Sequence, residues 1–292
     1  MFLEKMNPLG QRCVVSIIGI VIFLFAIVYA FHPLGRLLMP LLSVLMIGTA
    51  LKEYFSIARS KGYQPLEKLG LTFATAYIVV LFFSASAPFV DLLPLIALSA
   101  ALFSVFLYFF LKGEKPILNI AVTLFGILYL VIPLGCLLPL LYLFPPGSSQ
   151  DGRWWVLYLL AVTFFTNSCA LFIGKALGKR KLTPYISPNK TWEGAIGGFI
   201  SAIAISLGFY FMASWPLTHI PIALDFWEAI FLGASASVLA QFGDLAESLL
   251  KRDAGVKDSS KIPGLGGVLD VVDSMVFTCP FIYLYLKFHS FL

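Results

Sequence analysis

Long apolar runs follow one another along the whole chain, and short polar segments separate them. The run Val14–Ala30 is apolar all round, whereas a helix on the surface of a soluble protein keeps one polar face. The runs have close to the length that a helix needs to cross the core of a bilayer. We therefore predict nine membrane-spanning helices, at residues 13–31, 37–57, 70–89, 92–111, 117–144, 154–173, 195–214, 226–243 and 268–288.

Composition agrees with this pattern, since 60% of the residues are hydrophobic, 12% are charged and the mean hydropathy is +0.93. The expected fold class is an all-α polytopic membrane protein, because helices satisfy their backbone hydrogen bonds internally in lipid. Only the run at residues 117–144 is ambiguous. Pro133 and Pro139 would either kink it as one span or divide it into two.

The basic residues favour one fifth span and a cytoplasmic amino terminus. With nine spans, only Arg36, Arg153 and Lys287 of the 20 basic residues fall outside the cytoplasmic segments, as the positive-inside rule predicts. Dividing the fifth run would remove this asymmetry. We therefore expect the loops 174–194 and 243–270 to face the cytoplasm, and the protein to be a multi-pass component of the inner (cytoplasmic) cell membrane.

Candidate chemistry lies only in the second half of the chain. Residues 1–150, about five spans, carry the isolated charges Glu53, Glu67 and Asp91, for which solvation at the membrane interface is the expected explanation. Residues 151–292, about four spans, carry both motif loops. The net charge of +5 is spread over loops that flank spans and meet anionic lipid headgroups, a distribution that argues against nucleic acid as a partner.

The first motif loop is rich in groups that donate hydrogen bonds to phosphate oxygens. Two hydroxyls, an amide and an ammonium occur within the five residues 187–191, and a proline is expected to fix the turn that presents them. A loop whose lysines only orient the spans is the alternative explanation. The predicted substrate-binding residues here are Ser187, Pro188, Asn189, Lys190, Thr191 and Glu193.

The second motif segment carries carboxylates at helical spacing. Asp244 and Glu247 lie three residues apart on one helix face, and Asp270 and Asp273 repeat that spacing. Hard oxygen ligands beside basic residues suit Mg²⁺ that shares its coordination with a phosphate, although structural salt bridges are the alternative. Its other predicted members are Ser248, Lys251, Arg252, Lys257 and Asp258.

A glycine-rich turn, Pro263-Gly264-Leu265-Gly266-Gly267, lies between the two carboxylate pairs. Glycines there would let backbone N–H groups approach an anion at the start of the following helix. Glycine-rich turns are common, so the carboxylates on both sides are what favour this interpretation. Gly266 and Gly267 are therefore predicted to bind substrate.

In their order and spacing, these motifs resemble the signature of the phosphatidate cytidylyltransferases, or CDP-diacylglycerol synthases. The resemblance rests on Ser187-Pro188-Asn189-Lys190-Thr191-Trp192-Glu193-Gly194, Gly243-Asp244 with Glu247, Ser248-Leu249-Leu250-Lys251-Arg252, Lys257-Asp258 and the segment 263–274. It covers mostly residues 160–275, and the first half of the chain is similar only in being hydrophobic. The sequence departs from the family at Asn167, Leu171, Leu265 and Val271, where aspartate, tyrosine, histidine and arginine are usual.

The resemblance implies an enzyme that joins phosphatidic acid to CTP, releases pyrophosphate and makes CDP-diacylglycerol at the bilayer. It implies Mg²⁺, with a second, monovalent cation such as K⁺, and a homodimer. Asp244, Asp270, Asp273 and Glu247 would be the metal-binding residues, and Lys251 and Arg252 would share in catalysis with Asp244, Asp270 and Asp273. The site would lie at the cytoplasmic ends of the last helices.

Two other functional classes stay open at this point. A CTP-dependent lipid-alcohol kinase would use similar carboxylates and a metal, but its hydroxyl nucleophile should need a general base that the motifs do not supply. A membrane transporter would distribute charged residues along a pathway and often shows repeated, interrupted helices. Here the charges cluster at the ends of the last predicted spans.

Overall fold

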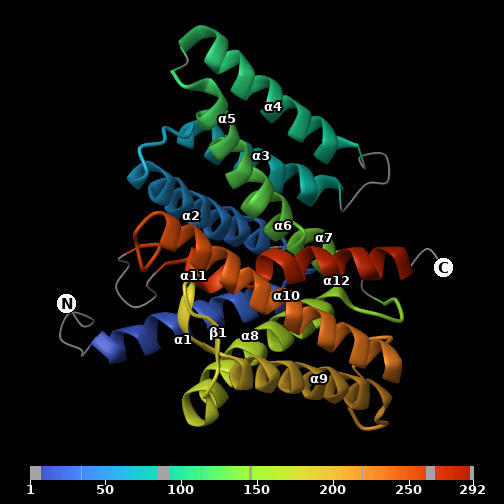
Figure 1. The fold of residues 1–292 in the computed structure, drawn as a ribbon. Helices are drawn as coiled ribbons and strands as arrows, with labels where there is room; N and C mark the ends of the chain where they lie inside the picture. The colour runs from blue at the N-terminus through green and yellow to red at the C-terminus, as the bar shows by residue number, and fades with distance from the viewer. Residues whose placement is uncertain are drawn as a thin grey trace. The chain divides into compact units, whose positions relative to one another are not determined.

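The computed structural model describes residues 8–33, 35–84, 92–112, 114–144, 147–218, 220–260 and 267–289, and most of them are helical (Figure 1). The helices are α1 (Pro8–Val28), α2 (Leu38–Ser60), α3 (Glu67–Ser84), α4 (Leu93–Lys112), α5 (Pro116–Gly126), the π-helical η3 (Ile127–Val131), α6 (Ile132–Gly135), α7 (Leu137–Leu141), α8 (Gly152–Leu177), α9 (Trp192–Ser214), α10 (Phe226–Asp253), α11 (Leu269–Val272) and α12 (Met275–His289). Among the described residues, seven helical segments are long and apolar enough to cross a membrane. The prediction of a helical integral membrane protein is confirmed.

The seven candidate spans are α2, α3, α4, the stretch from α5 to α7, α8, α9 and α10. The first predicted span overlaps α1, in which the residues with described side chains, Ile18–Val28, form an apolar helical segment. The last predicted span is divided between α11 and α12. The total of nine spans and the position of the amino terminus therefore stay predictions.

The fifth apolar run is continuous, and Pro116–Leu141 forms one candidate span of 26 residues. Within an α-helix, Pro133 would lack one hydrogen bond and its ring would clash with the carbonyl of the residue four positions earlier. The chain forms the wider π-helical turn η3 just before this proline, and such turns accommodate this kind of mismatch. The run therefore continues through a π-helical turn as one candidate span rather than as two.

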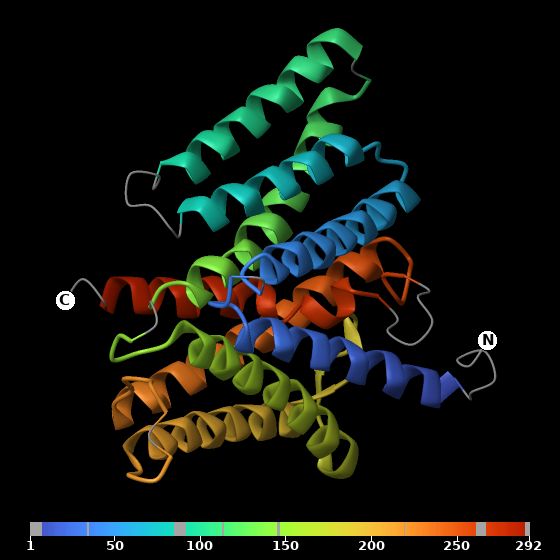
Figure 2. The ribbon, with the colours of Figure 1, turned by 180° about the vertical axis from the view of Figure 1, so that it is seen from behind.

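One compact unit contains Met1–Leu138 and Asp253–Val272. In this unit α2, α3 and α4 are successive neighbours (Figure 2). Apolar side chains such as Phe55 of α2 and Ile78 of α3 are fully buried. The Tyr54 hydroxyl donates to the Val122 carbonyl at 3.2 Å, which ties α2 to α5. The segment that follows α10 thus packs with the N-terminal helices.

The second compact unit contains Pro139–Arg252 and Asp273–Leu292. Helices α8 and α9 pack along one another, and the hydroxyls of Tyr158 and Ser206 are 2.7 Å apart. Ser206 also donates to the Ala229 carbonyl of α10 at 2.5 Å. Thr163 donates to Thr278 at 3.3 Å and so connects α8 with α12. The functional division that we predicted near residue 150 stays a prediction.

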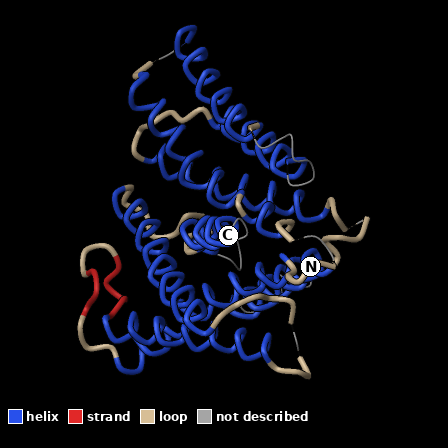
Figure 3. The backbone as a smooth tube through the Cα atoms, turned by 90° about the vertical axis from the view of Figure 1, so that its right-hand side faces the viewer, coloured by secondary structure: helices blue, strands red, loops and turns tan. Residues whose placement is uncertain are grey.

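A small antiparallel hairpin joins α8 to α9 and qualifies the all-α prediction (Figure 3). Its strands are β1 (Lys181–Thr183) and β2 (Ser187–Thr191), with Lys181 opposite Thr191 and Thr183 opposite Ser187. Thr191 ends the hairpin and begins α9, because its side chain accepts a hydrogen bond from the Gly194 N–H at 3.2 Å. The first motif loop is therefore an ordered hairpin attached to two helices.

Candidate active site

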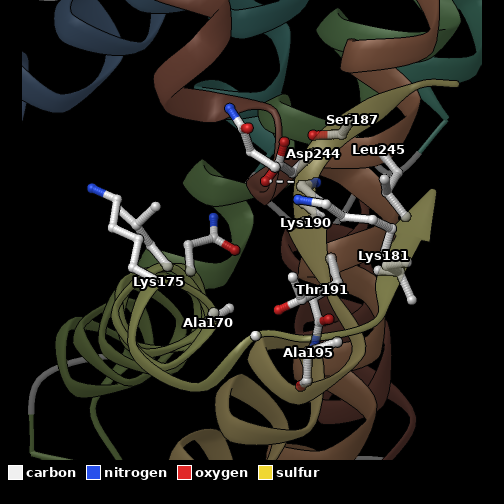
Figure 4. A pocket seen from close by; sticks show the side chains of 16 residues that line it. Ala170, Lys175, Lys181, Ser187, Lys190, Thr191, Ala195, Asp244 and Leu245 are labelled. Carbon is white, nitrogen blue, oxygen red and sulfur yellow. Dashed lines mark hydrogen bonds and ion pairs between the residues drawn. The ribbon is translucent and has the colours of Figure 1, made fainter. Parts of the chain in front are cut away.

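A cavity of about 580 Å³ lies in the second unit, against α8, the hairpin, the start of α9 and α10 (Figure 4). Its lining combines lysines, hydroxyls, amides and one carboxylate with small and apolar side chains. It is lined by Asn167, Ala170, Leu171, Gly174, Lys175, Gly178, Lys181, Leu182, Ser187, Asn189, Lys190, Thr191, Ala195, Gln241, Asp244 and Leu245. Four of the predicted residues of the first motif, Ser187, Asn189, Lys190 and Thr191, are brought together here.

The ion pair between Lys190 of β2 and Asp244 of α10 joins the two predicted motifs. Lys190 Nζ lies 2.8 Å from Asp244 Oδ2, and both side chains are partly exposed (Figure 4). Lys175 extends from α8 on another side of the same cavity, and Lys181 lies on β1. The cavity thus offers several ammonium groups to an anionic ligand, with a carboxylate in contact with one of them.

Two predicted members of the first motif have a structural place instead. Pro188 lies within β2, so the expectation that it fixes a turn was wrong; the turn of the hairpin is at residues 184–186. The Glu193 carboxylate accepts hydrogen bonds from the backbone N–H groups of Lys179 and Arg180, at 3.0 and 3.2 Å. Glu193 therefore holds the segment that leads into β1. Neither residue is among those that line the cavity.

Helix α10 carries the first carboxylate pair of the second motif. The helix continues to Asp253, ten residues beyond the predicted end at residue 243, so the helical spacing expected of Asp244 and Glu247 is confirmed. Glu247 is buried, and its carboxylate lies 2.5 Å from Lys251 Nζ. The Arg252 guanidinium donates to the Ile186 carbonyl at 3.2 Å, which ties the end of α10 to the turn of the hairpin. Ser248 is partly buried on the same helix.

Asp273 lies between α11 and α12, outside the seven candidate spans, and only 5% of it is exposed. Its backbone packs directly on α10, since a Cβ atom at Gly243 would be 2.4 Å from the Asp273 carbonyl oxygen. The Ser274 hydroxyl donates to Asp273 Oδ1 at 2.9 Å, and the Asn167 amide donates to that hydroxyl at 2.6 Å. Three side chains from α8 and the start of α12 thus form one connected network.

Electrostatics place Asp273 close to Asp244. Burial raises the pKa of Asp273 above its usual range, and the neighbouring Asp244 carboxylate adds to the rise, while hydrogen bonds from Ser274 and the charge of Lys190 oppose it. A pair of neighbouring carboxylates with this environment is stabilised by a cation. The ammonium of Lys190 contributes positive charge to this pair.

The donor chemistry of this pair fits Mg²⁺, which often binds one or two protein carboxylates and completes its coordination with water and substrate phosphates. Across the described residues, no group of three or more His, Cys, Asp or Glu side chains is arranged to hold a metal by itself. Asp244 and Asp273 would therefore need a phosphate-bearing substrate to complete such a site. The metal stays a prediction.

Asp270 belongs to the other unit, where it lies on α11. Its Oδ2 accepts a hydrogen bond from the Ser259 hydroxyl at 3.1 Å. Lys257 and Asp258 are exposed in the segment after α10, and Gly267 is described at the start of the α11 segment. Residues 261–266, which include Gly266 and all of the glycine-rich turn except Gly267, lie outside the described residues.

The isolated charges of the first half of the chain differ in their surroundings. Glu53 is buried and accepts hydrogen bonds, so solvation at the interface does not explain it. Glu67 pairs with Arg59. Asp91 lies outside the described residues.

The cavity is also lined by Asn167 and Gln241, which sequence reasoning did not name as functional candidates, because neither belongs to a charged motif.

Comparison with known proteins identifies the family. Residues 10–289 match the Cytidylyltransferase family. A phosphatidate cytidylyltransferase of Chlamydia trachomatis serovar D is 33% identical over 295 residues, covering 95% of this chain and 92% of that protein. The enzyme of the same name from Staphylococcus haemolyticus is 31% identical over 277 residues, 94% of this chain and 98% of that protein. That of Bacillus subtilis is 46% identical over 143 residues, about half of each chain.

The match extends over nearly the whole chain, including the first half, which the motifs alone did not cover. It confirms the resemblance drawn from residues 187–194 and 243–274, and it confirms that the protein is a nucleotidyltransferase. The chain belongs to the cytidylyltransferase family.

Proposed function

We propose that this protein is a phosphatidate cytidylyltransferase, which transfers the cytidylyl group of CTP to phosphatidic acid and so forms CDP-diacylglycerol and pyrophosphate. The observation that carries the proposal is the cavity in which Lys190 of the hairpin meets Asp244 of α10. Cations and hydroxyls suit the phosphates of both substrates, and a carboxylate pair suits the metal that accompanies a nucleotide. The names of relatives that match the full chain support the same substrates.

The chemistry needs charge neutralisation more than a general base. A phosphate oxygen of phosphatidic acid attacks the α-phosphorus of CTP, a new P–O bond forms, and the bond to the bridging oxygen of the β-phosphate breaks with its electrons leaving on pyrophosphate. A phosphomonoester has a second pKa of about 6, so the nucleophile is largely ionised at neutral pH. What limits the reaction is the approach of one anion to another in the correct alignment.

The residues of the second unit are suited to that task. Lys190, Lys175 and Lys181 would hold phosphate oxygens by charge-assisted hydrogen bonds, with Ser187 and Thr191 as hydroxyl donors. Mg²⁺ held by Asp244 and Asp273 would supply further positive charge where the triphosphate accumulates negative charge. Asn167 donates to Ser274, and Ser274 donates to Asp273. These hydrogen bonds would fix the orientation of the Asp273 carboxylate as a metal ligand.

The other assigned residues keep predicted roles. Arg252 supports the hairpin through Ile186, so its removal should act on the position of the hairpin as well as on any bound phosphate. Lys251 is paired with Glu247, which supports a role in fixing the end of α10. Asp270, the second monovalent cation and the homodimer follow from the family resemblance, and we propose them on that basis alone.

We also propose that the hairpin and the charged end of α10 face the cytoplasm of the cell, with the protein in its inner membrane. The excess of basic residues in these segments supports this orientation. CTP would then reach the cavity directly. This argument uses only the distribution of basic residues, so it does not depend on the roles assigned to the residues of the site.

The position of a radioactive label distinguishes this reaction from the alternatives. The purified protein in mixed micelles would receive phosphatidic acid or a lipid alcohol together with CTP labelled at either the α- or the γ-phosphate. We expect lipid-bound label only from α-labelled CTP and only with phosphatidic acid. Lipid-bound label from γ-labelled CTP with the alcohol would indicate a kinase. If folded protein turns over no nucleotide, both the cytidylyltransferase and the kinase function are refuted.

A further inference from the structure

The one deeply buried carboxylate among the described residues of α2 is that of Glu53, which is only 6% exposed. Its Oε1 accepts the backbone N–H of Val268 at 3.1 Å, and its Oε2 accepts the N–H of Leu269 at 2.8 Å. The Ser259 hydroxyl donates to the same Oε2 at 3.0 Å. All three donors come from the segment Asp253–Val272, which lies more than 200 positions away in sequence but in the same compact unit.

The Ser259 hydroxyl connects Glu53 with Asp270. Besides its contact with Glu53, it lies 3.1 Å from Asp270 Oδ2. One hydroxyl has one proton, so it can donate to only one of the two carboxylates at a time, but its oxygen contacts both. The Ser259 backbone N–H also points to Asp270 Oδ2, at 3.5 Å. Ser259 therefore links the Asp270 carboxylate to a residue of the first half of the chain.

Gly267 makes this close arrangement sterically feasible. A Cβ atom at this position would lie 1.8 Å from Ser259 Oγ, 2.8 Å from Glu53 Oε2 and 3.0 Å from Asp270 Oδ2. No side chain larger than hydrogen fits among these three polar groups. The last residue of the glycine-rich turn is thus required where the chain passes the pair of carboxylates.

A purely structural connection between α2 and this segment would not need a charge. Burying a carboxylate is costly unless hydrogen bonds satisfy it, and apolar packing would join the two elements at lower cost. The three donors offset the cost of Glu53, and they all fix the few residues that carry Asp270. Such outer contacts orient the groups that act on substrates, and their loss typically lowers activity about 10- to 100-fold.

We propose that Glu53 is a positioning residue for the transfer reaction: through Ser259 and the start of α11 it fixes the orientation of the Asp270 carboxylate. This inference rests on the proposed cytidylyl transfer and extends it to the N-terminal half of the chain. It assigns a function to a residue that otherwise resembles the other isolated charges of that half.

The test compares Glu53→Gln with Glu67→Gln. Glutamine preserves the size of the side chain, but its NH₂ group cannot accept a hydrogen bond. Both oxygens of Glu53 accept one, so at least one of the three hydrogen bonds is lost in the variant. Glu67 is a carboxylate of the same unit that pairs with Arg59 near the start of α3. Both variants remove one negative charge from a helix of the first half, and only one touches the Asp270 segment.

Two quantities are measured on purified protein in detergent: steady-state kinetics for CTP and phosphatidic acid, and amide hydrogen exchange of residues 253–272. For Glu53→Gln we expect kcat to fall about 10- to 100-fold with KM for CTP changed less than about threefold. We also expect faster exchange at Val268 and Leu269 while the other helices keep wild-type exchange. Glu67→Gln should match the wild type in both measurements.

If the wild type is active and Glu53→Gln has the same kcat, the positioning role of Glu53 is refuted and the proposed function stands. An inactive wild type would instead refute the proposed function. Ser259→Ala covers the case in which Glu53→Gln does not fold, because it keeps the backbone hydrogen bonds to Glu53 and removes only the hydroxyl shared with Asp270. We expect a fall in kcat there too, and a wild-type kcat in Ser259→Ala would equally contradict the proposal.

Discussion

Replacing Lys190 by methionine tests whether the hairpin binds substrate or only orients the membrane spans. Methionine keeps the length of the apolar part of the side chain and removes the ammonium, which lies 2.8 Å from Asp244 at the cavity. If that ammonium binds a phosphate in the transition state, the lost interaction is a hydrogen bond to a charged group, about 1.5–3 kcal/mol. Because 1.36 kcal/mol corresponds to a factor of ten, kcat/KM for CTP should fall about 10- to 150-fold.

Stability should change much less than activity. The ion pair with Asp244 is partly exposed, and pairs of this kind contribute about 0.2–1 kcal/mol. The matched control is Lys179→Met, which removes the same charge from the same loop at a residue that does not line the cavity. The assay is CDP-diacylglycerol formation at varied CTP, together with thermal unfolding in detergent. If Lys190→Met and Lys179→Met both keep wild-type kinetics, the lysines serve only topology and the assignment is refuted.

Three further variants or treatments test other parts of the account. Gly243→Ala should lower activity and stability, because its Cβ would be 2.4 Å from the Asp273 carbonyl oxygen, whereas Gly208→Ala, with no atom within 4 Å, should behave as the wild type; equal behaviour in activity and thermal unfolding would contradict the packing argument. Asp270→Ala should abolish turnover in folded protein, and near-normal kcat would remove this residue from the site. Tyr185 and Trp215 are exposed at opposite ends of α9, so a single cysteine at one position should react with a membrane-impermeant reagent from one side of sealed vesicles, and a cysteine at the other position from the other side. If both variants react from the same side, the predicted topology is refuted.

Hydropathy predicted the candidate spans because each apolar helix must meet lipid along its whole length. Hydropathy ended the eighth span at residue 243, and the helical spacing of Asp244 and Glu247 was the signal that the helix continues beyond it. Hydropathy missed the hairpin, because strands as short as Lys181–Thr183 and Ser187–Thr191 have no detectable alternation of polar and apolar residues. The prolines of the fifth run predicted a kink or a division, but not the π-helical turn at Ile127–Val131.

The chemistry of the site was predictable where it depends on local residue types. A lysine beside hydroxyls predicted a phosphate site, which stays a prediction; the structure shows that Lys190 and Thr191 line one cavity with Asp244. Contacts between distant parts of the chain were not predictable in this way. Asn167 donates to Ser274, which donates to Asp273, and Glu53 shares the Ser259 hydroxyl with Asp270. In both cases, a polar residue on an apolar helix was a signal that the sequence offered, and Asn167 also stands where the family usually has aspartate.

The most direct test of the central claim is formation of labelled CDP-diacylglycerol from CTP and phosphatidic acid by purified wild-type protein and by Asp244→Asn, each with Mg²⁺ and with EDTA. The account predicts product from the wild type only with Mg²⁺, and at least about 100-fold less from a folded Asp244→Asn variant, because the substitution removes a charge from the carboxylate pair beside the substrate phosphates. Undiminished product from Asp244→Asn would contradict the placement of the reaction in this cavity. No product from folded wild-type protein would contradict the proposed reaction itself.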